Sequence, residues 1–239
     1  MKQIIIYNLF FASFGTILGG ILGCFAFTKT PKQIGYLLGY TAGIMLGLVC
    51  IDILPSIISE YSLFKIIIFL ILGAVLTYLI DKTVQEKIDI SLNNSLKLTG
   101  ILMFIGLCLH NIPEGIALSS SLIFNQKMGI RVGIVMTLHD IPEGLAISAP
   151  LSAGGTKKLK ALGFSFASIL FTICGVFIGI FAYKIMHDLI YASLALASGA
   201  IIYIIYQDLI PQSLNYINDT QLTVMIIVGL VTSLIIISI

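Results

Sequence analysis

The chain has 239 residues, of which 58% are hydrophobic and only 10% are charged, and its formal net charge is +2. Soluble domains have roughly 45–50% apolar and about 25% charged residues, so this composition excludes a soluble globular protein and indicates an integral membrane protein. The nearly neutral charge gives no indication of a nucleic-acid-binding surface or of an acidic partner, and the partner that the composition predicts is the lipid bilayer.

Eight segments of the chain are long and apolar enough to cross a membrane, which takes about 20 predominantly apolar residues. In chain order they are residues 4–27, 34–59, 63–80, 98–124, 128–151, 160–184, 187–210 and 221–238. The first segment is longer than the apolar part of a secretory signal peptide, roughly 7–15 residues, so we expect it to be retained. The sequence therefore predicts an all-α, polytopic membrane protein in which residues 1–239 form a single transmembrane domain.

Lysine and arginine residues are distributed unevenly between the two sides of this arrangement. The breaks after the first, third and fifth segments hold eight of them, and the longest of these breaks, residues 81–97, is predicted to be a solvated loop. The N-terminus and the breaks after the second, fourth and sixth segments hold five. Because basic loops tend to remain cytoplasmic, we expect a protein of the cell (plasma) membrane with both termini outside.

Two internal repeats relate segments that run in opposite directions. His110–Ser119 and His139–Ser148, near the middles of the fourth and fifth segments, are identical at seven of ten positions. The second repeat pairs three residues of the second segment with three residues of the seventh, 156 positions further on: Gly43, Asp52 and Pro55 with Gly199, Asp208 and Pro211. Inverted repeats with Pro- or Gly-interrupted helices around a midplane site are typical of secondary transporters. We therefore expect segments one to three and six to eight to form inverted repeats around segments four and five.

The paired motifs place imidazole and carboxylate groups together on two helices. His110 and Glu114 are four residues apart and lie on one face of a helix, one turn apart, and His139 and Glu143 repeat this spacing. Each histidine is followed by a further polar residue that is within reach of the glutamate one turn on, namely Asn111 and Asp140.

Three of these residues are carboxylates that need a counter-charge. An Asp at the centre of a membrane helix costs roughly 2.5–3.5 kcal/mol on insertion scales, and the other basic residue of the fourth and fifth segments, Arg131, lies at a helix end. Protons or a bound metal ion are then the available counter-charges for Glu114, Asp140 and Glu143. Imidazole nitrogens with carboxylate oxygens suit zinc, iron, manganese or cadmium better than copper(I), which favours sulfur.

Two other functions use similar residues. A metal-dependent intramembrane hydrolase would carry HExxH, with two histidine ligands and a general-base glutamate on one helix, but both copies here have Glu at the fourth position after the histidine, at Glu114 and Glu143. A metal- or proton-sensing receptor without flux is the second alternative. Metal flux into liposomes separates both alternatives from a transporter.

These motifs resemble those of the ZIP family of zinc and iron transporters, bacterial type, whose fourth and fifth helices carry HNxPEG-type and xDxPEG-type sequences. The resemblance extends over nearly the whole chain, including Gly43–Leu46 of the second segment and Asp208–Pro211 at the end of the seventh. It implies eight spans, external termini and import of a divalent metal into the cytosol. The bound metal would be the transported ion itself, most plainly zinc, with iron, manganese or cadmium as alternatives. The resemblance implies no catalytic residues and no cofactor-binding residues. A homodimer is compatible with it.

The resemblance also implies a set of metal-binding residues. His110, Glu114, His139 and Glu143 would form a midplane site, with Asn111 and Asp140 beside a second metal bridged by the glutamates. Residues that would lie along the path are Met45 near the site, Asp52 near the outer entrance, and Gln207 and Asp208 on the cytoplasmic release side.

Two positions depart from the family pattern. Thr172 and Ile173 stand where bacterial members often have a Glu-Pro pair, so a second metal would lose a carboxylate ligand. Gln207 stands in place of a frequent histidine.

Overall fold

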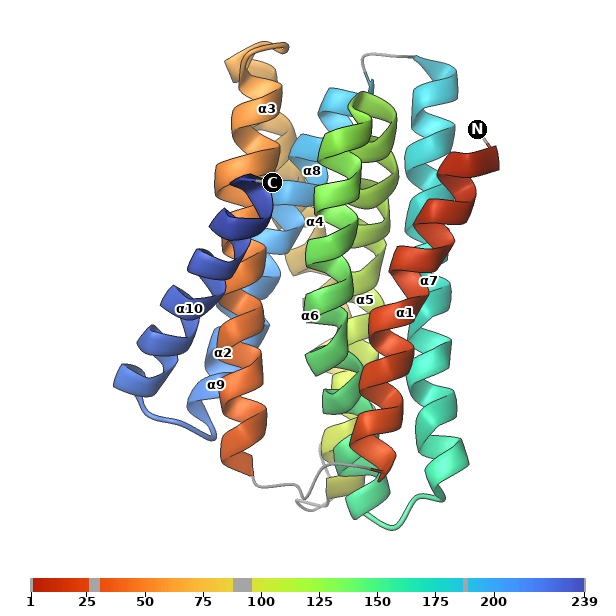
Figure 1. The fold of residues 1–239 in the computed structure, drawn as a ribbon, viewed down its shortest axis with the longest axis vertical. Coiled ribbons are helices and arrows are strands. Elements are labelled where there is room, and N and C mark those ends of the chain that lie inside the picture. Colours follow the sequence, from red (N-terminus) through yellow and green to blue (C-terminus); the bar gives the residue numbers. More distant parts are fainter. Residues whose placement is uncertain (1, 26–30, 88–95, 187–188, 239) are drawn as a thin grey trace.

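The computed structural model describes residues 2–25, 31–87, 96–186 and 189–238, and within these ranges all regular structure is helical. The helices are α1 (Lys2–Phe25), α2 (Pro31–Gly47), η1 (Leu48–Ile53), α3 (Leu54–Ile58), α4 (Leu63–Lys87), α5 (Leu96–Phe124), α6 (Gln126–Ala153), α7 (Lys158–Ile185), α8 (Leu189–Ile204), η2 (Ile205–Leu209), α9 (Ile210–Leu214) and α10 (Asp219–Ser238). The long helices lie roughly parallel and antiparallel in one bundle (Figure 1). The prediction of an all-α protein is confirmed.

Five helical stretches of the described residues are long and apolar enough to cross a membrane. They are Gly35–Ile58, Leu63–Thr83, Lys158–Ile185, Leu189–Leu214 and Asp219–Ser238. The chain is therefore a multi-pass membrane protein.

The prediction of a loop over residues 81–97 was wrong at both ends of this range, where the chain is helical. Helix α4 continues to Lys87 and α5 begins at Leu96, while residues 88–95 lie outside the described residues. Polar residues at the end of a membrane helix lower its hydropathy without ending its hydrogen bonding, so the apolar segment is shorter than the helix.

Two of the membrane helices contain a short π-helical segment that ends two residues before a proline. Segment η1 lies between α2 and α3, and η2 lies between α8 and α9. In η1 the Leu54 N–H donates to the Val49 carbonyl, five residues back, and in η2 the Ile210 N–H donates to the Ile205 carbonyl. Pro55 and Pro211 follow directly and have no N–H to donate. These interruptions are 156 positions apart, so the second sequence repeat is also a repeat of backbone structure, and π-helical segments are frequent at functional sites.

Close contacts between helices follow the same repeat. A Cβ atom added to Gly19 of α1 would collide with the Ile141 carbonyl of α6, and one added to Gly175 of α7 would collide with the Ile112 carbonyl of α5. The glycines are 156 positions apart and the isoleucines are repeat partners, 29 positions apart. In the same way Gly43 of α2 packs on α10 and Gly199 of α8 packs on α4. The pairs α1 and α7, α2 and α8, and α4 and α10 therefore occupy equivalent places.

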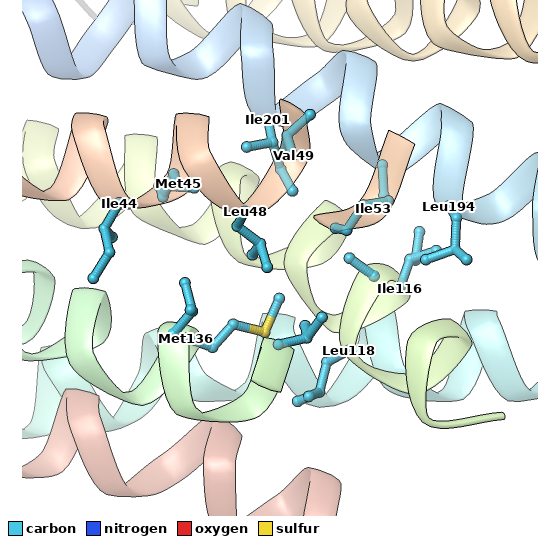
Figure 2. Close-up of a cluster of buried hydrophobic side chains, with 14 of the residues drawn as sticks. Ile44, Met45, Leu48, Val49, Ile53, Ile116, Leu118, Met136, Leu194 and Ile201 are labelled. Atoms are coloured by element: carbon cyan, nitrogen blue, oxygen red, sulfur yellow. The ribbon is translucent and has the colours of Figure 1, made fainter. Parts of the chain in front are cut away.

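The helices form two groups. Helices α1, α5, α6 and α7 pack on one another, whereas α2 packs on α10 and α4 packs on α8. We call the first the motif group, because it carries both HxxxE motifs, and the second the flanking group. Helix α5 contacts α8 and α6 contacts α2, so the groups meet there. Buried apolar side chains fill this boundary in Figure 2: Ile44, Met45, Leu48, Val49, Ile53, Ile116, Leu118, Met136, Leu194 and Ile201.

Replacing Gly175 with alanine is expected to destabilise the protein by about 1–3 kcal/mol, the usual cost of overpacking, because the new methyl group would collide with backbone that has little freedom to move. Thermal unfolding of the purified protein in detergent measures the change. Gly163 lies on the same helix with no described atom within 4 Å of an added Cβ, so Gly163→Ala is the control. Alanine favours helix over glycine by about 1 kcal/mol, and equal unfolding temperatures for the two variants would contradict the close α5–α7 contact.

Candidate metal centre

Four side chains from α5 and α6 meet where these helices cross. Glu114 comes from α5, and His139, Asp140 and Glu143 come from α6. One ligand atom from each lies within 4.8 Å of the others, and all four residues are buried. The two HxxxE motifs thus contribute to one cluster rather than to two separate sites.

The imidazole of His139 is held in a defined orientation by the backbone of its own helix. Its Nδ1 lies 3.1 Å from the Val135 carbonyl oxygen. A carbonyl oxygen only accepts hydrogen bonds, so Nδ1 carries the proton, and in the neutral ring Nε2 then has a free lone pair. In metal-binding histidines, the ring nitrogen that does not bind the metal usually donates a hydrogen bond of this kind, which fixes the orientation of the ring.

The second ring nitrogen, Nε2, is directed at the carboxylates. It lies 2.7 Å from Glu114 Oε1, 3.4 Å from Asp140 Oδ1 and 4.0 Å from Glu143 Oε1. Three acidic oxygens and one imidazole nitrogen thus converge where His139 is fully buried and Glu114 is 2% exposed. Such a density of negative charge in a low dielectric requires protons or a cation, and this donor set suits a divalent transition metal.

Asn111 of the first motif is anchored to the neighbouring helix. Its Nδ2 donates a hydrogen bond of 3.0 Å to the Ser168 carbonyl of α7, while its buried Oδ1 accepts no hydrogen bond from any described residue. The backbone of His110 belongs to α5, but its side chain lies outside the described residues. The predicted role of His110 as a ligand stays a prediction.

The four residues expected along the path do not belong to the cluster. Met45 is buried in the apolar boundary between the helix groups. Asp52, on η1, forms an ion pair with Arg131 of α6 at 2.8 Å. Gln207 and Asp208 lie on η2, where the first is exposed and the second is partly buried.

Thr172, the position that departs from the family pattern, lies beside the centre. It is buried on α7, and its backbone carbonyl packs against Gly115, the residue that follows Glu114. Its repeat partner Thr16 packs in the same way against Gly144, the residue that follows Glu143. The backbone of residue 172 therefore lies next to the turn of α5 that carries Glu114, so a longer side chain at this position would begin close to the centre.

Sequence reasoning missed two partnerships. The Val135 carbonyl as the partner of His139 has no sequence signal, because every helical residue has a carbonyl. The Asp52–Arg131 pair had one: Asp52 is the one charged residue of its apolar segment and Arg131 is the one lysine or arginine of its segment, and opposite charges pair with one another inside membranes.

Comparisons with known proteins agree with the resemblance seen in the motifs. The family described as ZIP zinc transporter matches residues 82–237, more than half of the chain. A protein named zinc transporter ZupT from Escherichia coli O7:K1 (strain IAI39 / ExPEC) is 30% identical over 215 residues, which cover 84% of this chain and 82% of the relative. ZupT of Shigella dysenteriae serotype 1 (strain Sd197) is 29% identical with the same coverage. The chain belongs to the ZIP family of zinc transporters.

Proposed function

We propose that this protein transports zinc across the membrane, into the cytosol, through the cluster of Glu114, His139, Asp140 and Glu143. The observation that carries the proposal is the convergence of these four ligand atoms within 4.8 Å at a buried helix crossing. Membership of a zinc transporter family and the similarity to ZupT support the choice of ion. His110, and Asn111 with its buried oxygen, complete the proposed ligand set.

The donor chemistry favours zinc and allows other ions. Zinc commonly takes four nitrogen and oxygen ligands at about 2.0–2.2 Å, so small movements of the four side chains around a central ion would suffice. Iron(II), manganese and cadmium accept similar ligands and are proposed as weaker substrates. A hydrolase is not favoured, because the relatives are transporters and each motif has only one histidine.

The two helix groups offer a transport mechanism. We propose eight membrane crossings: α1, α4, α5, α6, α7 and α10 each make one, and α2–η1–α3 and α8–η2–α9 make one each. Equivalent helices of the inverted repeat would then exchange environments as the motif group moves against the flanking group, exposing the cluster to each side in turn. Met45 faces this moving boundary, and Asp52 and Asp208 lie on the repeated interruptions at its two ends.

Uptake of zinc by purified protein in liposomes, with a panel of divalent cations, tests the proposal. We expect saturable uptake of zinc, slower uptake of iron(II), manganese and cadmium, and exclusion of magnesium and calcium, which prefer sites made of oxygen ligands alone. Protein-free liposomes are the control. Correctly inserted protein that carries no zinc above this control would overturn the proposed function.

Both termini are expected outside the cell, because an even number of crossings puts them on one side and the basic bias of eight to five makes the opposite side cytoplasmic. The beginning of α1 and the end of α10 lie in the same half of the bundle in Figure 1. Tags at each terminus, labelled in intact cells by an impermeant reagent, measure the orientation. Labelling that appears only after permeabilisation contradicts it.

One zinc ion is expected to bind tightly in the unmodified protein. A single divalent ion offsets two of the three carboxylate charges, whereas two ions would exceed them. Thr172→Glu adds a carboxylate beside Gly115 and should raise the zinc content towards two per chain without abolishing transport. Elemental analysis of purified protein measures the stoichiometry, and Thr223→Glu, the same change at an exposed position of α10, is the control that should leave the zinc content unchanged. Two tightly bound ions in the unmodified protein would contradict the charge argument.

A further inference from the structure

Arg131 and Asp52 form a two-pronged ion pair across the boundary between the two helix groups. Arg131 Nη2 donates to Asp52 Oδ1 at 2.8 Å and Nε donates to Oδ2 at 3.2 Å. Asp52 is 3% exposed and Arg131 is 28% exposed. Bidentate pairs of this kind are among the stronger side-chain interactions because both charges also hydrogen-bond. The pair therefore ties α6 of the motif group to η1 of the flanking group.

This ion pair is separated from the metal centre by an apolar layer. Arg131 precedes His139 by eight residues on α6, about 12 Å along a helix. Between them Val132, Val135 and Met136 are buried with Leu48 and Val49 in the same hydrophobic cluster, and Figure 2 shows this region between η1 and α6. A hydrated metal ion approaching from the end of the bundle where α6 begins would meet the ion pair first and the apolar layer second.

Aromatic residues bridge the groups at the same end. Phe124, the last residue of α5, packs edge-on against Tyr191 near the start of α8 with ring centroids 5.6 Å apart, and Tyr191 stacks on Tyr61 at 5.1 Å. The motif group is thus attached to the flanking group at two places on this end, one polar and one aromatic. These contacts join the two groups at the end of the bundle where α6 begins.

The inverted repeat does not place an arginine and an aspartate at the two positions equivalent to Arg131 and Asp52. The repeat partner of Asp52 is Asp208, 156 positions on, but the partner of Arg131, 29 positions earlier, is Leu102. When inverted halves exchange conformations, the environment of one end becomes that of the other. Because the Arg131–Asp52 pair joins the two groups at this end, it stabilises the state in which this end is closed, and a contact that differs between two states is what sets their populations.

We propose that the Arg131–Asp52 pair is a latch that holds shut the end of the bundle at which α6 begins, and that it must open before metal from that side reaches the cluster. The proposal rests on the proposed transport function for its purpose, but the latch itself is a property of the conformational equilibrium. Asp52 is then the first carboxylate that an incoming metal ion meets. The metal ion has to displace the guanidinium group of Arg131 from Asp52.

Accessibility of single cysteines tests the latch without any measurement of transport. Met136 and its repeat partner Leu107 are both buried and report on the two ends of the bundle. Each is replaced by cysteine in a chain whose four native cysteines are alanine, and labelling by a water-soluble maleimide is timed in detergent. We expect Arg131→Gln to raise the labelling rate of Met136→Cys by about tenfold, the size expected when a minor state of a few per cent becomes dominant, and to lower that of Leu107→Cys.

Three further variants separate a latch from general loosening. The exchanged pair Arg131→Asp with Asp52→Arg should return both labelling rates towards those of the parent. Asp52→Asn should act like Arg131→Gln, since it removes the same pair from the other side. Lys127→Gln, an exposed change one turn away on α6, should change neither rate.

The labelling rates of the two cysteines decide for or against the latch. Equal increases at both cysteines, or unchanged rates in both single variants, would overturn the latch. If the single variants do not fold, folding of the exchanged pair with parent-like labelling at both ends supports it, and its failure to fold alongside them counts against it. A protein that shows the opposed labelling changes yet carries no zinc in liposomes would refute the transport function and leave the latch standing.

Discussion

Glu114→Gln is expected to reduce zinc uptake into liposomes by about a hundredfold or more. Glu114 supplies the oxygen nearest to His139 Nε2, at 2.7 Å, and the amide keeps the size of the side chain while removing its negative charge. Loss of residues that merely support metal ligands costs about 10–100-fold in affinity or activity, so loss of an anionic ligand should cost at least as much. Uptake is measured at limiting zinc with equal amounts of inserted protein.

The matched control makes the same chemical change on the surface. Glu60 is exposed in the turn between α3 and α4, and Glu60→Gln should leave uptake at the parental rate. The amide at position 114 also removes one of three clustered negative charges, so this variant should insert and fold at least as well as the parent. Parental uptake by Glu114→Gln would refute the cluster as the transport site.

Five of the eight predicted spans coincide with helical stretches that are long and apolar enough to cross a membrane, because crossing a bilayer demands long apolar segments whatever their tertiary contacts. Within these five spans the errors of the sequence prediction lie at the helix ends. The segment expected over residues 187–210 continues through Pro211 to Leu214, because the preceding π-helical turn allows the chain to resume a helix at the proline. Hydropathy does not register such a change of hydrogen-bonding pattern.

The centre was predictable in its residue types and less so in its geometry. The repeated HxxxE motif placed histidine and glutamate on one face of each helix, and the structure brings Glu114 of one motif to His139 of the other. Which motif residues meet depends on the α5–α6 crossing, and that is set by close glycine contacts with α7 and α1 at Gly115 and Gly144. A glycine in a sequence does not reveal which backbone packs on it.

The same argument explains why the inverted repeat was only partly visible. Gly43, Asp52 and Pro55 stand out because their partners are identical 156 positions on. The equivalence of α1 with α7 rests on Gly19 and Gly175, which are inconspicuous in sequence and become evident once each is seen against a repeat-related carbonyl. Membrane helices require small residues at such crossings and tolerate most apolar residues elsewhere, so little sequence identity survives between the halves.

Zinc is expected to raise the unfolding temperature of the purified protein, and His139→Ala is expected to abolish the effect. A ligand that binds only the folded state stabilises it by about 2.7 kcal/mol at a hundred times its dissociation constant. For a chain of this size that amounts to about 5–10 °C. The effect should be marked here because the ion relieves repulsion among three buried carboxylates, and it should vanish with His139, whose Nε2 is the one described nitrogen in the cluster.

Gln207 provides the control for this experiment. It lies on η2, exposed and outside the cluster, so Gln207→Ala should retain the full zinc-dependent shift. Magnesium at the same concentration should produce no shift in any variant, because a site with a histidine nitrogen at its centre does not suit an ion that prefers oxygen ligands. An undiminished zinc shift in His139→Ala would place the tight site elsewhere, and loss of the shift in Gln207→Ala would show that η2 takes part in tight binding as well as in the path to the cytosol.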